Sequence, residues 1–303
     1  RRRSHLVTMN RMPPRPPPGL LRFGCCGSMI NPATDPVGIE IVEELASQGF
    51  DYIELSLRDL AALPEPALTA LVARVRATGL ICEVCNNFFP PEIRLTGRAA
   101  NFPAALRYAR HALAVAARLG VSVVVFGSAG ARNVPARFSH AEAWTQLRSL
   151  LMALGPLAQL EGITLAIEHL QRGESNILNT VAESWRMEQE VAHPNVRLLV
   201  DSYHLLQENE DPAILTRAVS AIAHVHVARG RDRVFPDEPD AALSAFFAAL
   251  VAGGYDGRCS IEANTRNFSA EAPRALQLCC DLALPNPVEP AAMRSELTTK
   301  NTK

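Results

Sequence analysis

Short apolar runs, rich in β-branched residues, recur along the chain and alternate with longer Ala- and Leu-rich stretches. Runs of four to eight apolar residues are typical of strands that are buried on both faces of a parallel sheet. Eight such runs occur, at 21–26, 51–55, 80–85, 121–126, 163–168, 196–201, 222–227 and 258–262. The pattern therefore predicts eight strands with helices between them.

The stretches between the runs have helical spacing. Leu68, Leu71 and Val75 follow one another at intervals of three and four residues, which places them on one helix face. A glycine follows a helical stretch and precedes the next apolar run at Gly49, Gly79, Gly120 and Gly162. This is the usual position of a glycine that ends a helix.

Eight strands alternating with helices over about 265 residues favour one α/β domain, a (β/α)8 TIM barrel at 21–284. A doubly wound open sheet is the alternative. It lacks support because no G-x-G-x-x-G follows the first run, and GSAGAR at 127–132 does not match that fingerprint. The sequence also contains no G-x-x-x-x-G-K-[ST] phosphate-binding loop.

The two ends of the chain differ from the barrel in composition. Residues 1–20 are basic and Pro-rich and predict a disordered extension, in which Met9 and Met12 are the candidate native starts, and 285–303 predict a flexible tail. The chain has 30 Lys+Arg and 31 Asp+Glu, a net charge of -1, and subtracting the five Arg of the extension leaves -6 for the rest. An acidic body disfavours binding to nucleic acid or to an anionic membrane.

The sequence also indicates the compartment in which the protein is found. No apolar run reaches the roughly 18 to 20 residues needed to span a bilayer, and the N-terminal region lacks a secretory pattern, so we expect a cytoplasmic protein.

Cys82 and Cys85 form a C-x-x-C that could be a redox or zinc pair. Residues three apart on a strand point to opposite faces, however, so we expect buried, reduced thiols.

Ionisable residues stand where four of the predicted strands end, at Glu168, Asp201, His226 and Glu262. In a TIM barrel the C-terminal ends of the strands carry the chemistry. Alternation places Ala166 on the same face as Glu168, so an inward-facing alanine implies an inward-facing acid. His224 shares the face of His226 but lies deeper, and we expect it to be hydrogen-bonded rather than a ligand.

Three carboxylates and one histidine at one point indicate a metal ion, because carboxylates repel one another and are costly to bury without a cation. Any one of these acids alone would more simply be a helix cap or an ion-pair partner. Four such residues at four strand ends favour a shared site, and we refer to Glu168, Asp201, His226 and Glu262 as the quartet. Their oxygen-rich character suits Mn²⁺, Mg²⁺ or Co²⁺ better than a thiolate zinc site.

Six segments also carry a resemblance to a known family. They are NNFFPPEIRLTG (86–97), FGSAGARNVP (126–135), IEHLQRGESNILNT (167–180), LLVDSYHL (198–205), HVHVARGRDRVFP (224–236) and SIEAN (260–264). Over 21–283 the chain resembles the sugar phosphate isomerase/epimerase family, the xylose-isomerase-like TIM barrels. Within it, the chain is most similar to ketose 3-epimerases such as D-tagatose 3-epimerase and D-allulose 3-epimerase.

The resemblance implies roles for individual residues. It makes Glu168, Asp201, His226 and Glu262 the ligands of one divalent metal ion, with Mn²⁺ expected, and makes Glu168 and Glu262 the acid/base pair. It places Glu174 and His204 against the substrate. The family's arginine falls on Asp232 here, between Arg231 and Arg233, and we favour Arg233. The glycine that usually follows the Pro of this segment, Pro236 here, is missing, so we expect a different substrate-facing loop.

The implied activity is epimerisation or isomerisation of a ketose through an enediolate, by a homo-oligomer, either a dimer or a tetramer. A lyase of the same fold is an alternative, acting by β-elimination of an oxidised C-glycoside or by dehydration of an inosose. An apurinic-site endonuclease is less favoured, because it needs more histidines at strand ends. A non-catalytic subunit is a third alternative. It would predict that at least one of the four ligand residues is lost, whereas all four are present.

Two interpretations remain open for each of three further features. Arg132 matches a family motif or anchors the loop of the fourth strand. Phe88 and Phe89 form an apolar wall for substrate or pack within the protein. Trp144 and Trp185 lie in helical stretches, where packing is the more usual role.

Overall fold

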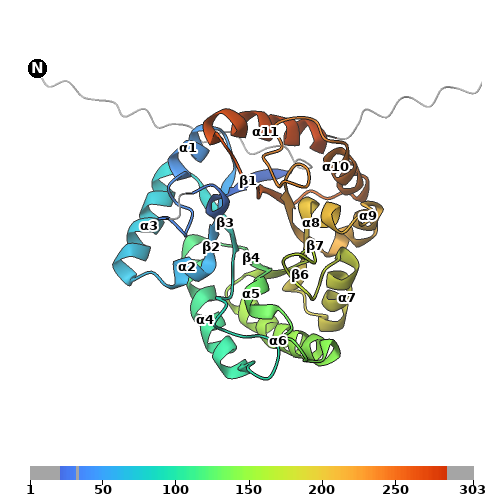
Figure 1. Ribbon diagram of the computed structural model, residues 1–303. Helices are drawn as coiled ribbons and strands as arrows, with labels where there is room; N and C mark the ends of the chain where they lie inside the picture. The colour runs from blue at the N-terminus through green and yellow to red at the C-terminus, as the bar shows by residue number, and fades with distance from the viewer. Residues whose placement is uncertain (1–20, 32–33, 285–303) are drawn as a thin grey trace, which may run out of the picture.

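The eight predicted apolar runs form the strands of a closed parallel barrel in the computed structural model, which describes residues 21–31 and 34–284 (Figure 1). The strands are β1 (Arg22–Cys26), β2 (Tyr52–Ser56), β3 (Ile81–Asn86), β4 (Val123–Phe126), β5 (Thr164–Glu168), β6 (Val196–Asp201), β7 (Ile222–Val227) and β8 (Arg258–Ile261). Each strand pairs with the next, and β1 pairs with β8 to close the barrel. The (β/α)8 prediction is confirmed. The predicted extension 1–20 and tail 285–303 lie outside the described residues.

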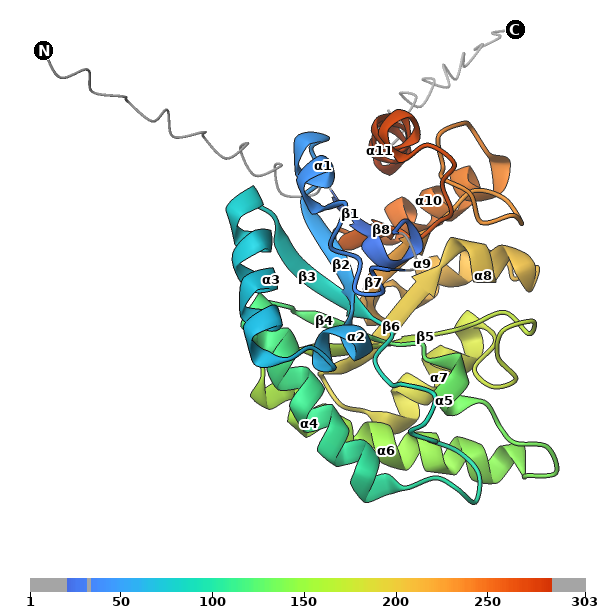
Figure 2. The same cartoon turned by 60° about the vertical axis from the view of Figure 1, so that its left-hand side comes forward.

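Helices cover the outside of the barrel (Figures 1 and 2). The α-helices are α1 (Val42–Ser47), α2 (Leu57–Ala61), α3 (Glu65–Thr78), α4 (Phe102–Leu119), α5 (Ala129–Arg132), α6 (His140–Leu160), α7 (Val181–Val191), α8 (Ser202–Gln207), α9 (Ala213–Ala218), α10 (Ala241–Gly253) and α11 (Phe268–Ala283), with short 3-10 turns at Gly27–Met29 and Val219–Ala221. Gly79 and Gly120 end α3 and α4 with φ of 81° and 84°, a conformation that glycine adopts without strain. Within the described residues, no helix combines the length and apolarity that crossing a bilayer requires.

Alternation along the strands separates two apolar layers. Outward-facing side chains pack against the helices in the main core, whereas a smaller cluster fills the barrel interior. The interior cluster consists of Tyr52, Val84, Val123, Val125, Ala166 and Leu199. Ala166 and Leu199 lie two residues before Glu168 and Asp201, so both acids also point inward, at the C-terminal mouth of the barrel.

A β-bulge interrupts this alternation in β3. Ile53 pairs with Cys82 and Glu54 pairs with Val84, so Glu83 is the extra residue. The bulge brings the sulfur atoms of Cys82 and Cys85 to 3.9 Å from each other, and both belong to the outer core. The expectation that these cysteines face opposite ways is therefore wrong, although both are buried free thiols as predicted.

The bulge residue Glu83 forms a charged cluster at the other end of the barrel. Its carboxylate contacts Arg22 at 2.5 Å and forms an ion pair with Arg258. These arginines are the first residues of β1 and β8, so the cluster lies at the N-terminal face of the strands. In TIM barrels this face contributes to stability rather than to chemistry.

Candidate active site

The four predicted ligand residues converge at the mouth of the barrel. Glu168 ends β5, Asp201 ends β6, His226 lies in β7, and Glu262 follows β8 directly. Each offers one ligand atom, and these four atoms all lie within 4.8 Å of one another. All four residues are buried, so the strand ends form one compact polar cluster.

The donor atoms fit a hard divalent cation. Nδ1 of His226 lies 3.0 Å from Oε2 of Glu262 and 3.3 Å from Oε1 of Glu168. This nitrogen is buried, and among the described residues it has no hydrogen-bond partner. A buried nitrogen without a partner is costly unless it binds something, and three carboxylates beside it supply the oxygen ligands that Mn²⁺ or Mg²⁺ prefers.

The two glutamates have different electrostatic environments. Burial raises the pKa of Glu168 to about 7, and Glu262 and Asp201 add to this rise against the opposing effect of His226. Burial also disfavours ionisation of Glu262, but His226 and Arg233 outweigh it and hold the pKa of Glu262 well below its usual range. Without a cation, the two carboxyl groups therefore differ in how readily they ionise.

Arg233, rather than Arg231, points into the cluster. Its Nη2 atom forms an ion pair with Glu262 and lies 3.4 Å from Oδ2 of Asp201, and its guanidinium stacks over the Tyr203 ring at 4.9 Å. Arg231 instead donates to Asn209 and Gln207 at the surface. The structure thus places the arginine that we favoured from the sequence beside the predicted ligands.

His204 and Glu174 lie next to the same cluster. Nδ1 of His204 accepts a hydrogen bond from the backbone N–H of Gln171, so its Nε2 carries the hydrogen and lies 3.5 Å from Oδ2 of Asp201. Burial and the nearby Arg233 hold the pKa of His204 well below its usual value, which keeps the ring neutral. Glu174 is more exposed and lies 3.8 Å from Arg233.

Several contributors were not predicted from the sequence. Glu54, in the middle of β2, hydrogen-bonds to Nε2 of both His224 and His226. His224 is thus a hydrogen-bonded, deeper residue as expected. The signal for Glu54 was available, because a lone carboxylate inside an apolar strand is itself unusual.

Three other side chains help to hold the predicted ligands in place. Asn86 donates to Oε1 of Glu262 over 3.2 Å, and Sγ of Cys26 lies 3.7 Å from the same oxygen. His169 accepts the backbone N–H of Asp201 at Nε2, and burial lowers the pKa of His169 to about 3, so it stays neutral. These contacts depend on strand order and could not be predicted without it.

The packing interpretation fits the aromatic residues. Phe88 and Phe89 are buried, with ring centroids 4.3 Å apart, and Phe89 also packs on Tyr108 at 5.5 Å. Trp144 on α6 donates to Glu190 on α7, and Trp185 packs partly buried against the outer core. These residues stabilise the barrel and its loops.

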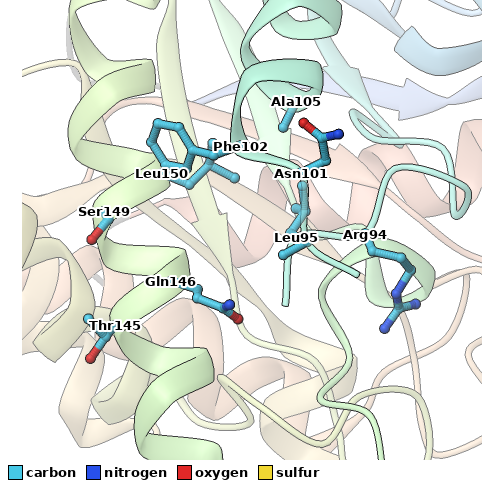
Figure 3. A pocket seen from close by; sticks show the side chains of 10 residues that line it. Arg94, Leu95, Asn101, Phe102, Ala105, Thr145, Gln146, Ser149 and Leu150 are labelled. Carbon is cyan, nitrogen blue, oxygen red and sulfur yellow. The ribbon is translucent and has the colours of Figure 1, made fainter. Parts of the chain in front are cut away.

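A separate pocket of about 210 Å³ opens between α4 and α6 (Figure 3). Its walls come from residues 94–105 and from α6, and include Phe102, Gln146 and Leu150. It contains none of the seven predicted site residues. The chemistry-bearing groups therefore gather at the strand ends and not in this pocket.

Comparison with known proteins agrees with this architecture. An L-ribulose 3-epimerase from Mesorhizobium japonicum is 30% identical over 131 residues, covering 43% of this chain and 42% of that enzyme. An L-ribulose 3-epimerase from Methylomonas sp. is 28% identical over 232 residues, covering 75% of this chain and 77% of that enzyme. A 3-dehydroshikimate dehydratase from Pseudomonas putida is 28% identical over 137 residues, but the match covers only 21% of that enzyme.

The fold itself matches a solved structure. The crystal structure of a D-psicose 3-epimerase in the presence of D-fructose superimposes with a TM-score of 0.76 at 19% identity, over 87% of this chain and 99% of that chain. A family model described as "Xylose isomerase-like TIM barrel" matches residues 42–281. The chain belongs to the xylose isomerase-like TIM barrel family.

Proposed function

We propose that this protein is a divalent-metal-dependent sugar epimerase or isomerase that abstracts a proton beside the carbonyl of a ketose. The observation that carries the proposal is the buried cluster in which Glu168 and Glu262 both lie against Nδ1 of His226. The 3-epimerases among its relatives support the same class of reaction.

Glu168, Asp201, His226 and Glu262 would hold the metal ion, and we propose Mn²⁺, with Mg²⁺ and Co²⁺ as alternatives. When bound, a divalent cation supplies positive charge that stabilises the oxygen atoms that become negative in an enediolate. In this proposal Asp201 would act only as a metal ligand and would not transfer a proton. Its backbone N–H, which donates to His169, helps to keep it in place.

The two glutamates approach the centre from different parts of the barrel, because β6 and β7 separate β5 from β8. In the proposed reaction one carboxylate removes the proton from the carbon beside the carbonyl. The electron pair of the broken C–H bond forms the enediolate, and the other carboxyl group returns a proton to the opposite face. Two carboxyl groups on different sides are what inversion requires, since one alone would return the proton to the original face.

The remaining polar groups would orient the sugar. The Nε2–H of His204 and the guanidinium of Arg233 are donors suited to the carbonyl oxygen and its developing charge. Glu174, at the more exposed side of the cluster, is an acceptor suited to a hydroxyl group. Together these residues would bind the sugar with its reacting carbon between the glutamates.

The direct test is Glu262→Gln, which keeps the shape of the side chain and removes its proton chemistry. We expect the rate of epimer formation from a ketose, measured together with solvent-deuterium uptake by NMR with added Mn²⁺, to fall at least about 100-fold. Glu188→Gln is the matched control, because Glu188 is a buried carboxylate on α7 that pairs with Arg197 and is remote from the cluster. Substantial inversion by the Glu262 variant would remove Glu262 from the acid/base pair, whereas exchange without inversion would be the activity of Glu168 alone.

The same assay on a panel of substrates separates the proposed activity from a lyase. Free ketoses, ketose phosphates and oxidised glycosides are each incubated with Mn²⁺. Deuterium uptake with inversion supports the epimerase. Loss of water or of an aglycone would favour the lyase, for which the dehydratase relative is the supporting observation.

Assembly and location are proposals as well. We propose a homo-oligomer, either a dimer or a tetramer, in the cytoplasm. Light scattering of the purified full chain measures the assembly state, and a monomeric mass at micromolar concentration would contradict it.

A further inference from the structure

Glu54 is a carboxylate enclosed in the barrel interior. It lies in the middle of β2 and is fully buried. Its ion-pair partners among the described residues are two histidines of β7, His224 and His226. Nε2 of His226 lies 3.1 Å and 3.2 Å from the two oxygens of Glu54, and Nε2 of His224 lies 3.2 Å from Oε2. Burying a carboxylate costs free energy, so we expect Glu54 to have a specific role at this position.

The contact with Glu54 determines how His226 presents its other nitrogen. An ionised carboxylate only accepts hydrogen bonds, so Nε2 of His226 must carry a hydrogen. A neutral imidazole with its hydrogen on Nε2 has its lone pair on Nδ1. Nδ1 is the atom that lies against Glu168 and Glu262 and that has no hydrogen-bond partner among the described residues.

We propose that Glu54 is a positioning residue, which fixes the tautomer and the ring orientation of His226 so that Nδ1 faces the carboxylate cluster as a ligand. The proposal rests on the metal site of the proposed function and adds a residue outside the quartet to it. A carboxylate behind a ligating histidine also raises the basicity of the ring and typically increases metal affinity by about 10- to 100-fold.

Glu54 is itself held by a chain of buried polar groups. Nε2 of His224, which contacts Oε2 of Glu54, also lies 3.2 Å from Oγ of Ser260. Ser260 in turn lies 3.0 Å from the hydroxyl group of Tyr52. The chain runs from Glu54 of β2 through His224 of β7 and Ser260 of β8 to Tyr52 of β2, so it gives the Glu54 carboxylate a second anchor besides His226.

A second arrangement, in which a cation lies between Glu54, His224 and His226, must be distinguished from the proposed hydrogen bonding. One donor atom each from Glu54, His224 and His226 also lies within 4.8 Å of the others, which is compatible with a cation between them. That cation would need Nε2 of His226, whereas the quartet uses Nδ1 of the same ring. Both nitrogens could bind metal only if the ring lost both hydrogens, so we favour hydrogen bonding at Nε2.

The first measurement is metal affinity. Glu54→Gln keeps the size of the side chain but removes its charge, and its amide group can donate to Nε2 and permit the other tautomer. We expect the Kd for Mn²⁺, measured by electron paramagnetic resonance, to rise about 10- to 100-fold with one site per chain. Glu188→Gln is the matched control, because it makes the same change at a buried carboxylate of α7 that pairs with Arg197, and its Kd should stay within about twofold.

The second measurement reads the tautomer directly in metal-free protein, at a pH high enough to leave the His226 ring neutral despite the neighbouring carboxylates of Glu54, Glu168 and Glu262. Long-range ¹H–¹⁵N NMR of the histidine rings should show His226 of the wild-type chain with its hydrogen on Nε2, and Glu54→Gln should populate the Nδ1–H form. A His226→Asn variant assigns the signals. This spectrum distinguishes positioning from general stabilisation, because a merely structural role of Glu54 would leave the tautomer unchanged.

The outcomes separate this proposal from the proposed function. If wild-type protein binds Mn²⁺ and the Glu54 variant binds it equally with an unchanged tautomer, the role of Glu54 is overturned and the metal site stands. If wild-type protein binds no divalent metal, the metal site fails, and an Nδ1–H tautomer in the wild-type spectrum would overturn the role of Glu54 as well. A fall from two bound ions to one would make Glu54 a ligand of a second site and overturn the proposal. If Glu54→Gln does not fold, the wild-type tautomer and the charge-retaining Glu54→Asp variant still decide.

Discussion

Nη1 of Arg132 donates a hydrogen bond to the backbone carbonyl oxygen of Glu168 over 2.8 Å, and another to that of Phe126 over 2.9 Å. Arg132 is fully buried, and its hydrogen-bond partners among the described residues are backbone carbonyl oxygens. Burial lowers the pKa of Arg132 to about 10, which still leaves it charged near neutral pH. This side chain therefore joins the ends of β4 and β5 and anchors the backbone of Glu168, which supports the anchoring interpretation of Arg132.

Replacing Arg132 by Met should reduce activity more than stability explains. Methionine fills much of the apolar space, but it leaves the carbonyl groups of Phe126 and Glu168 without their donor, at a cost of about 1–3 kcal/mol in the free energy of unfolding. The freed strand end should let Glu168 move, and we expect deuterium exchange to fall by about 100-fold in fully folded protein. Urea unfolding and the exchange rate are measured on the same sample.

Arg94→Met is the control for that experiment. Arg94 also donates to backbone carbonyl groups of the loop, those of Gly130 and Asn133, but it is more exposed and does not contact β5. It should alter stability slightly and leave exchange near the wild-type rate. Equal losses of activity in the two variants would show that loop order in general, rather than the anchoring of Glu168, is what matters.

Gly127 should be intolerant of a side chain because of its closeness to Glu168. A Cβ atom added at Gly127 would lie 1.8 Å from Oε2 of Glu168 and 2.9 Å from its Cδ. The carboxylate would have to move, so we expect Gly127→Ala to fold with a loss of about 1–3 kcal/mol but to lose about 100-fold in exchange rate. Gly130→Ala is the control, since its added Cβ would meet Pro91 and not Glu168. Wild-type exchange by the Gly127 variant would contradict the placement of the Glu168 carboxylate.

The sequence was sufficient to predict the barrel and the quartet for a definite physical reason. Strand alternation is a local property, so the inward position of Ala166 also determines that of Glu168, and Leu199 does the same for Asp201. Because parallel strands in a barrel end at one mouth, the convergence of four candidate ligands could be predicted without knowing any distance.

Contacts between strands could not be predicted in this way. The bulge at Glu83 arises from the pairing of β2 with β3, and it brings Cys82 and Cys85, which were expected on opposite faces, to the same face. Asn86 and Cys26 reach Glu262 because β1, β3 and the end of β8 approach one another across the mouth, which is a property of the closed barrel. The choice of Arg233 over Arg231 likewise depends on the conformation of one loop.

The charged cluster at the opposite end of the barrel should affect stability alone. Glu83 is 5% exposed and is shared by Arg22 and Arg258, so Glu83→Ala removes the carboxylate with which both arginines pair. We expect the free energy of unfolding to fall by about 1–3 kcal/mol with exchange activity retained. Glu40→Ala removes an exposed carboxylate 3.6 Å from Arg74 and should cost less than about 0.5 kcal/mol. A specific loss of activity in the Glu83 variant would mean that this face also controls the mouth.

Metal binding should be measurable as stabilisation of the folded protein. A ligand that binds only the folded state stabilises it by about 2.7 kcal/mol at a concentration of 100 Kd, so excess Mn²⁺ should raise Tm by several degrees and EDTA should reverse the rise. Asp201→Asn is the informative variant, because Asn can still accept the backbone N–H of Tyr203 as Asp201 does, while one of the three clustered negative charges is lost. In EDTA its Tm should equal or exceed that of the wild type, since repulsion among buried carboxylates is reduced, whereas its response to Mn²⁺ should be largely lost. Glu40→Gln serves as the control for weak binding of Mn²⁺ to surface carboxylates and should respond to the metal as the wild type does. An undiminished Mn²⁺ response in the Asp201 variant would place the bound metal elsewhere in the protein.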